Sequence, residues 1–228
     1  MLRFVFNNKE ERAGKQVRTF WIYALGEFAL VFLGILIALQ VDNWNQNQRV
    51  RKLETVMLGE LLANLKSDLD DVNSNIDIQT SSLVSAQITL DFIDGDGPWH
   101  DSLSTHFGNL SDATIFYENI SSYESLKSLG IDLISNDSIR QQITHLYAVS
   151  YELMATLEER ALTHTFESMN ASIGKHLFTK ELLRSYVPLD LTELKESNEF
   201  RNNVMISFVL TGFQLVTYKR IKEELQNM

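Results

Sequence analysis

The sequence predicts an all-α protein, in which one N-terminal transmembrane helix continues into a long helix and an antiparallel helical bundle follows. Three observations predict this class. Only two prolines and ten glycines occur in 228 residues, so the turns that sheets and barrels require are scarce. The long stretches are rich in good helix formers such as Glu, Leu, Lys, Gln and Ala. One stretch near the N-terminus is almost free of polar residues.

Residues 1–19 are predicted to form a short basic head on the cytoplasmic side. Two acidic residues in this head, Glu10 and Glu11, are outnumbered by five basic ones: Arg3, Lys9, Arg12, Lys15 and Arg18. Beyond residue 41 the balance reverses to 15 basic against 27 acidic residues, a net charge of −12. Such an acidic domain lacks the basic face that phosphate binding requires, which argues against nucleic acid as a partner. The absence of cysteine excludes disulfides, thiolate metal sites and cysteine nucleophiles.

Residues 20–41 form the predicted membrane helix, and Glu27 is the only charged residue among these 22. A helix of this length measures about 33 Å, enough to cross a hydrocarbon core of roughly 30 Å. Trp21 and Tyr23 at one end and Trp44 at the other are expected to anchor it at the membrane interfaces. The alternatives are a buried core helix, which is rarely so long and apolar, and a cleavable signal peptide. The second would be shorter and would end at a small-x-small site.

Charge around this helix predicts its orientation. Cytoplasmic flanks of membrane helices carry an excess of Lys and Arg. Five basic residues precede the helix, whereas three follow it closely, at Arg49, Arg51 and Lys52. We therefore expect a cytoplasmic N-terminus and an exoplasmic helical domain over residues 42–228.

One face of the membrane helix is small and polar. At 100° per residue, five side chains fall within about 40° of one line: Glu27, Gly34, Ala38, Val41 and Asn45. Bulky residues such as Phe28 and Phe32 lie opposite. Gly34-x-x-x-Ala38 permits close approach of a second helix, and the simplest partner in the bilayer is the same helix from another copy. We therefore expect a homo-oligomer. In the alternative, Glu27 lies only about 10 Å from the helix end and reaches water or Arg18.

From Leu58 the apolar residues recur with the 4-3-4-3 spacing of a coiled-coil seam over five heptads. The seam comprises Leu58, Leu62, Leu65, Leu69, Val72, Ile76, Gln79, Leu83, Ala86, Leu90 and Ile93. Residues 42–51 contain no helix breaker, so this helix is expected to continue from the membrane helix. The seam packs either against later helices of the same chain, which we favour, or against another copy.

Residues 94–98 (Asp-Gly-Asp-Gly-Pro) predict a turn, because glycine and proline interrupt helices. The two aspartates also suggest calcium, but the loop lacks the other ligands of an EF-hand. A second helix, or a helix pair, is expected over residues 111–129, with Ser111 or Asp112 as its N-cap and Gly130 as its stop.

A third helix is predicted from Asn136 to about Ala171, whereas residues 172–180 are ambiguous. Residues 188–192 suit a connector, and Ser197 or Asn198 suits the N-cap of a last helix that ends near Gln226. Its apolar part, residues 204–216, is too short for a second membrane span, so a buried helix is expected.

No catalytic or metal signature is recognisable. The five histidines form no i, i+4 pair with a third ligand at metal spacing. His164-x-x-Glu167 resembles half of a carboxylate-bridged metal site, but no second copy occurs. Phosphate-binding loops and nucleophile elbows are also missing from the sequence. We therefore expect no enzyme activity and no cofactor.

Three motifs stand out in and after the predicted membrane helix: Tyr23-Ala-Leu-Gly-Glu27, Gly34-Ile-Leu-Ile-Ala-Leu39 and Asn43-Trp44-Asn45. Together they resemble the membrane segment of a bacterial family of single-span inner-membrane proteins of unknown function. Weaker matches are Tyr123-Glu-Ser-Leu-Lys-Ser-Leu-Gly130 and Asn198-Glu-Phe-Arg201. The resemblance implies a bacterial inner-membrane protein with a periplasmic helical domain, and it supplies no activity.

These features favour a non-enzymatic, self-associating envelope protein that acts as a scaffold or as an accessory subunit of another membrane complex. The alternative is an oligomeric ion or proton channel in which Glu27 carboxylates ring a pore. Phe20 and Val31 also approach that face and could close such a pore. A third hypothesis, ligand sensing by the bundle, has less support because the head is too short to form a signalling domain.

Overall fold

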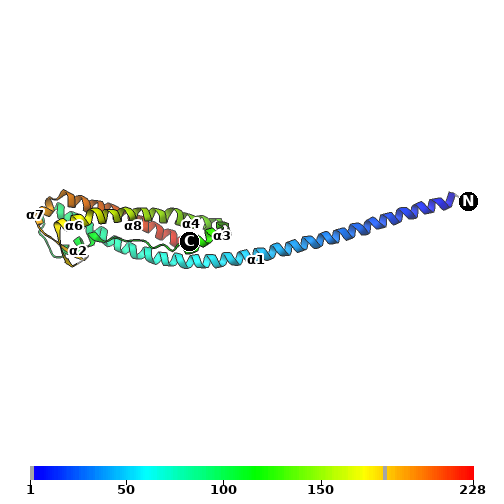
Figure 1. The fold of residues 1–228 in the computed structure, drawn as a ribbon, viewed down its shortest axis with the longest axis horizontal. Coiled ribbons are helices and arrows are strands. Elements are labelled where there is room, and N and C mark those ends of the chain that lie inside the picture. Colours follow the sequence, from blue (N-terminus) through cyan, green and yellow to red (C-terminus); the bar gives the residue numbers. More distant parts are fainter. Residues whose placement is uncertain (1–2, 182–183) are drawn as a thin grey trace. The chain divides into compact units, whose positions relative to one another are not determined.

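The computed structural model describes residues 3–181 and 184–228, with side chains from residue 20 onward except Ile22, Leu182 and Leu183. The chain divides into two compact units, Met1–Thr55 and Val56–Met228 (Figure 1). The all-α class is confirmed. The basic side chains of the predicted head lie outside the described residues.

Helix α1 runs from Arg3 to Asp94 and is 92 residues long. No proline occurs before Pro98, so no ring interrupts the backbone hydrogen bonds of this helix. The predicted turn follows at residues 95–98. Residues 20–41 and the predicted seam therefore belong to one helix, as expected.

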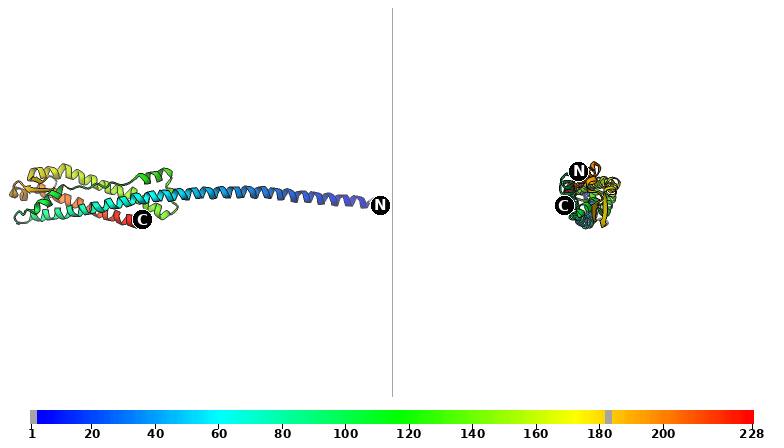
Figure 2. Two further views of the ribbon diagram at one scale, coloured as in Figure 1. Left: turned by 90° about the horizontal axis from the view of Figure 1, so that it is seen from below. Right: turned by 90° about the vertical axis from the view of Figure 1, so that its left-hand side faces the viewer.

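The second unit contains three long helical runs, namely α1 from Val56 onward, residues 137–176, and α8 (Asn198–Asn227). The middle run comprises α4 (Asp137–His145), η3 (Leu146–Tyr151), α5 (Glu152–His164), η4 (Thr165–Met169) and α6 (Asn170–His176). Helix α8 is antiparallel to this run, since Ser150 bonds Glu224 whereas Lys175 bonds Glu199. Figures 1 and 2 show the two side by side. The predicted antiparallel bundle is therefore present.

An extended segment, residues 112–120, lies along α1 in this bundle. It follows α2 (Leu103–Gly108) and the short turn η1 (Asn109–Ser111), and it precedes α3 (Ser121–Leu129) and η2 (Ile131–Leu133). The prediction of a helix over residues 111–129 is thus wrong up to Ile120, and neither Ser111 nor Asp112 is the N-cap of α3, which begins at Ser121. Gly130 does end α3, with φ of 103°, a conformation that favours glycine.

Two predicted helix starts are confirmed by their cap hydrogen bonds. Asn136 accepts from the backbone N–H groups of Ser138 and Ile139, and Ser197 accepts from that of Phe200. Between α6 and α8, β1 (Leu177–Glu181) pairs antiparallel with β2 (Ser185–Pro188), and α7 (Leu191–Glu196) follows. The sequence did not predict this hairpin.

The hairpin approaches α2 very closely at Gly108. A Cβ at this position would lie 2.1 Å from the backbone oxygen of Arg184. Only glycine therefore permits this packing of α2 against the hairpin.

The core of the second unit consists of two hydrophobic clusters. The first cluster holds Leu61, Leu65, Val72, Phe116, Tyr123, Leu126, Ile134, Ile143, Leu146, Tyr147, Tyr151, Met154, Tyr218, Ile221 and Leu225. The second cluster holds Ala86, Leu90, Phe92, Ile93, Phe107, Leu110, Met169, Ile173, Leu177, Tyr186, Leu194, Phe200 and Val204. Along α1 the two clusters are separated by the residues between Val72 and Ala86.

The buried face of α1 differs from the predicted seam. Leu65, Val72, Gln79, Ala86, Leu90 and Ile93 are buried as expected, but Leu62 is 52% exposed. The other buried row consists of Leu61, Asp68, Asn75, Ser82 and Thr89, seven residues apart. The seam is therefore rotated toward polar residues, which a count of apolar positions alone could not detect.

Helix α8 buries only one face of residues 204–216. Val204 and Leu215 are buried, whereas Val209, Phe213 and Val216 are exposed. The predicted buried helix is thus amphipathic.

Candidate functional site

The five residues of the predicted membrane stripe all lie on α1 in the first unit. Glu27, Gly34, Ala38, Val41 and Asn45 are all exposed. Within the described residues, α1 is the one helix long and apolar enough to cross a membrane, and none of its most apolar window is buried. Burial inside the chain therefore does not explain the apolar character of residues 20–41.

The other features of this segment are equally open. A Cβ at Gly34 would meet no atom within 4 Å, so the helix surface is free for close contact there. The predicted interface anchors Trp21, Tyr23 and Trp44 are more than 60% exposed. Contact of these residues with lipid or with a second copy stays a prediction.

In the second unit, a row of buried polar side chains lies on the inner face of α1. Asp68, Asn75, Ser82 and Thr89 recur every seven residues and are all buried, and Gln79 is buried beside them. Because side chains seven residues apart lie on one face of a helix, they form a continuous polar row. Asp68 and Asn75 of this row, with Gln79 beside them, bond the extended segment.

Carboxylates hold the extended segment through its backbone. Asp68 Oδ1 accepts from the N–H of Asn119 at 2.9 Å, and Asp71 Oδ2 accepts from that of Tyr117 at 3.1 Å. From α5, Glu158 Oε1 accepts from the N–H of Phe116 at 2.9 Å. These acceptors replace the i−4 carbonyls of a helix, which explains why residues 112–120 stay extended.

Asp68 is fully buried and has several donors. Its Oδ1 also accepts from the Asn119 amide at 2.7 Å, and its Oδ2 accepts from the Tyr151 hydroxyl at 2.8 Å. Burial raises the pKa of Asp68 above its ordinary value, although these hydrogen bonds oppose the change. The pKa of Tyr151 is likewise raised, first by burial and then by the nearby Asp68.

Glu158 forms a second buried carboxylate centre. The Tyr218 hydroxyl donates to its Oε1 at 2.5 Å, and only 5% of the residue is exposed. Burial raises the pKa of Glu158, and burial also raises that of Tyr218. Each buried carboxylate therefore has a tyrosine donor and a backbone N–H donor.

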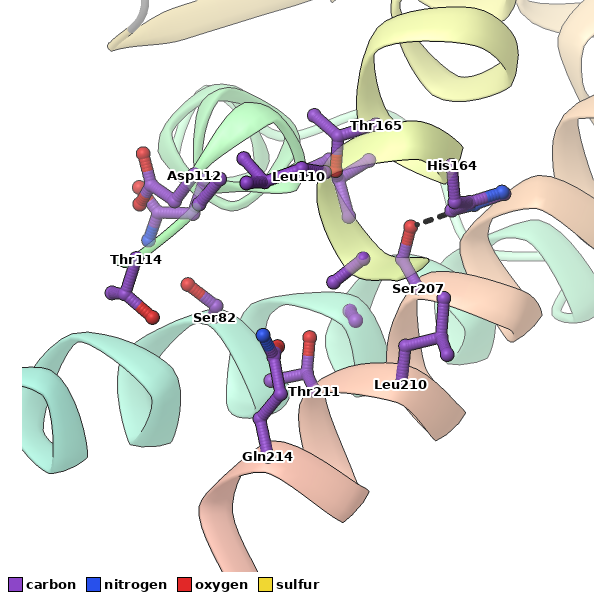
Figure 3. A pocket seen from close by; sticks show the side chains of 15 residues that line it. Ser82, Leu110, Asp112, Thr114, His164, Thr165, Ser207, Leu210, Thr211 and Gln214 are labelled. Carbon is purple, nitrogen blue, oxygen red and sulfur yellow. Dashed lines mark hydrogen bonds between the residues drawn. The ribbon is translucent and has the colours of Figure 1, made fainter. Parts of the chain in front are cut away.

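Between the two hydrophobic clusters lies a group of neutral polar side chains. The Gln79 amide donates to Thr114 Oγ1 at 2.6 Å and to Gln214 Oε1 at 3.1 Å. Next to this triad lies a cavity of about 20 Å³ whose polar lining includes Ser82, Thr165 and Thr211 (Figure 3). Thr165 is also the first residue of the π-helical turn η4, a feature frequent at functional sites.

His164 lies at the edge of this cavity and has protein partners. Its Nε2 lies 3.0 Å from the backbone oxygen of Asn203 and 3.1 Å from Ser207 Oγ. Figure 3 shows the second contact. His164 therefore joins α5 to α8, and its predicted spacing partner Glu167 is exposed.

Sequence reasoning missed the polar row, although a signal for it exists. The polar residues of α1 that bond the 114–122 segment are spaced by three or four residues: Asn64, Asp68, Asp71, Asn75 and Gln79. They are short or uncharged, unlike the Lys and Glu typical of solvent-facing positions. Such a periodic run on the flank of an apolar seam indicates a buried polar face.

Comparison with known proteins identifies a family but no activity. A family model described as "Family of unknown function (DUF6090)" matches residues 27–211, which is most of the chain. The match begins at Glu27 and includes the polar row and the extended segment. No curated protein and no solved structure matches the chain. The predicted resemblance to a family of unknown function is thus confirmed in that form.

Proposed function

From the premise that this chain belongs to the DUF6090 family of unknown function, we propose a membrane-anchored, non-enzymatic scaffold that associates with itself through residues 20–41. The same reasoning makes it a single-pass protein of the bacterial inner membrane, with a cytoplasmic N-terminus and a periplasmic bundle. It serves either alone or as an accessory subunit of another membrane complex. The observation that carries the proposal is an apolar helix whose described side chains the chain itself leaves exposed.

Lipid accounts for the apolar surface, and a second copy accounts for the small and polar stripe. Gly34 and Ala38 lie one turn apart, and their small side chains let two helices approach closely enough for extensive packing. Glu27 on the same stripe is costly in hydrocarbon unless it is paired, protonated or turned toward protein. No hydrogen bond or ion pair joins Glu27 to the described part of the chain. Contact between stripes removes this carboxylate from lipid.

The decisive experiment measures the mass of the full-length protein in mild detergent, together with cross-linking in native membranes. We expect a multiple of the 26.2 kDa chain mass. Gly34→Leu is expected to weaken association about tenfold, or roughly 1.4 kcal/mol, by blocking close approach. Leu36→Phe, on the bulky side of the helix, is the matched control. A strictly monomeric protein that captures no other protein would contradict the proposal.

A second candidate function is a cation pathway. It is supported by the exposed carboxylate of Glu27 within an otherwise uncharged stretch, because rings of carboxylates favour cations. Cation flux into liposomes that carry the purified protein tests it, with Glu27→Gln as the variant. Flux that is unchanged by this substitution would exclude a pore lined by Glu27.

A further inference from the structure

The cavity beside Ser82 lies where the core changes character. Its walls come from α1, the 109–114 segment, the end of α5 with the start of η4, and α8. The first cluster ends near it at Tyr218, and the second begins at Ala86 and Leu110, which line it. The three helical runs and the 109–114 segment thus meet around one small polar space.

The buried hydroxyl of Ser82 indicates that the cavity binds a small molecule, called the guest below. The residue is 7% exposed, and its hydroxyl is buried without a hydrogen-bond partner among the described residues. A buried hydroxyl without a partner costs about 1–3 kcal/mol, so such groups are rare unless something satisfies them. Figure 3 shows Ser82 on α1 directed toward the 109–114 segment, and Thr211 and Gln214 on α8 next to it.

The chemistry of the lining favours a neutral guest. Two acceptors of the lining, Thr114 Oγ1 and Gln214 Oε1, already accept hydrogen bonds from the Gln79 amide, and the Asp112 carboxylate lies at the exposed mouth. Ser207, a further lining residue, is engaged with His164. Among the described residues, no hydrogen bond engages the lining hydroxyls of Ser82, Thr165 and Thr211, and each can both donate and accept. That combination complements another hydroxyl rather than an ion.

The size of the cavity sets the scale of the guest. A volume of about 20 Å³ exceeds the roughly 10–15 Å³ that one water requires, and a buried water needs two to four polar partners. The hydroxyl end of a small alcohol or diol meets the same requirement. Asp112 and Ala113 at the mouth are exposed, which gives such a molecule access from solvent.

We propose that this cavity is a binding site for one neutral hydroxyl group, held by Ser82 and Thr211, that bridges α1 and α8 between the two hydrophobic clusters. The group belongs either to a water molecule or to a small alcohol. This inference is independent of the proposed scaffold function, because it concerns the second unit alone.

The test combines the direction of a shift in the thermal unfolding midpoint with a crystal structure of the site. Ser82→Val in the full chain fills the space and removes the hydroxyl. If a guest is bound, the variant expels it and leaves Thr211 without a partner, so the unfolding midpoint falls by about 4 °C. If no guest binds, the same change removes an unsatisfied buried hydroxyl and fills a void, so the midpoint rises or stays unchanged. That second outcome would overturn the proposal.

The matched control is Ser81→Val on the exposed side of α1. We expect this substitution to shift the unfolding midpoint by no more than about 1 °C. Should Ser82→Val fail to fold, a high-resolution crystal structure of the unaltered chain decides. Density for a single atom within hydrogen-bond distance of Ser82 Oγ identifies water, and diol density after soaking in ethylene glycol identifies the alcohol source. Absence of density in both crystals, with Ser82 bonded to a protein acceptor, would refute the site.

Discussion

Two stretches of the same helix differ in where their polar side chains lie and in what they bond. In residues 20–41 of α1, the polar Glu27 stands on an exposed surface without a partner among the described residues. In residues 61–93, Asp68 is fully buried and accepts from Asn119 and Tyr151. The difference teaches that a polar residue on an apolar helix marks either a surface that awaits another molecule or a face that holds part of its own chain.

The extended segment explains the second case. A strand outside a sheet exposes backbone donors that must be satisfied, and buried carboxylates supply the acceptors. Asp68 and Glu158 stay buried because each has a backbone N–H and a tyrosine hydroxyl as donors. The bundle thus uses three helical runs and one extended segment around a partly polar core.

The largest expected effect breaks this arrangement at Asp68. Asp68→Ala leaves the N–H of Asn119 and the hydroxyl of Tyr151 buried without their acceptor. We expect a loss of about 3 kcal/mol in the free energy of unfolding, measured by denaturant titration followed by circular dichroism. Asp70→Ala, exposed two residues away, is the control and is expected to stay within about 0.5 kcal/mol. Equal losses in the two variants would show that the hydrogen bonds of Asp68 are not what matters.

A second prediction concerns pH and the bundle alone. The folded pKa values of Asp68 and Glu158 lie above their unfolded values because of burial, so folding takes up protons. This stabilisation is fully present below the unfolded pKa, near 4, and is lost as the pH rises through the folded pKa. We therefore expect the unfolding midpoint to rise as the pH falls from neutral toward about 4.

The neighbouring charges strengthen this expectation. Glu118 has a pKa raised in the same direction by burial, and Asp71 adds negative charge beside Asp68. Each additional proton taken up on folding contributes at most about 1.4 kcal/mol per pH unit. The double variant Asp68→Asn and Glu158→Gln is expected to flatten the pH profile. A profile equally steep in the double variant would assign the effect to other groups.

A third prediction concerns residues 20–41, the stretch that we propose to span a membrane. Glu27→Ala is expected to leave the unfolding midpoint of the bundle unchanged, because Glu27 has no partner in the described part of the second unit. Self-association in detergent should weaken several-fold, since about 1 kcal/mol is typical for one polar contact between membrane helices. A shift of the bundle's midpoint larger than about 2 °C would remove the contrast between the two stretches.

The smallest expected effect is at a helix cap. Asn136→Ala removes the acceptor for the N–H groups of Ser138 and Ile139 and should cost about 1 kcal/mol. Gln142→Ala, exposed in the same helix, serves as the control. This pair also calibrates the larger loss at Asp68, because a cap at the surface can be replaced by water whereas a buried acceptor cannot.

The sequence by itself determined the features that depend on neighbours along the chain. The absence of proline before Pro98 predicted the unbroken α1, the turn residues 94–98 predicted its end, and Asn136, Ser197 and Gly130 predicted helix boundaries. Local hydrogen bonds and backbone conformations produce these features, so each could be recognised from a few adjacent residues.

Only the tertiary structure decided where the polar residues of α1 point. Asp68, Asn75 and Ser82 read as solvent-facing flanks of an apolar seam until the extended segment lies against them. The hairpin against Gly108 and the extended conformation of residues 112–120 depend likewise on partners far away in the chain. A backbone donor is satisfied equally well by a near carbonyl or a distant carboxylate, and the choice between them is made by packing.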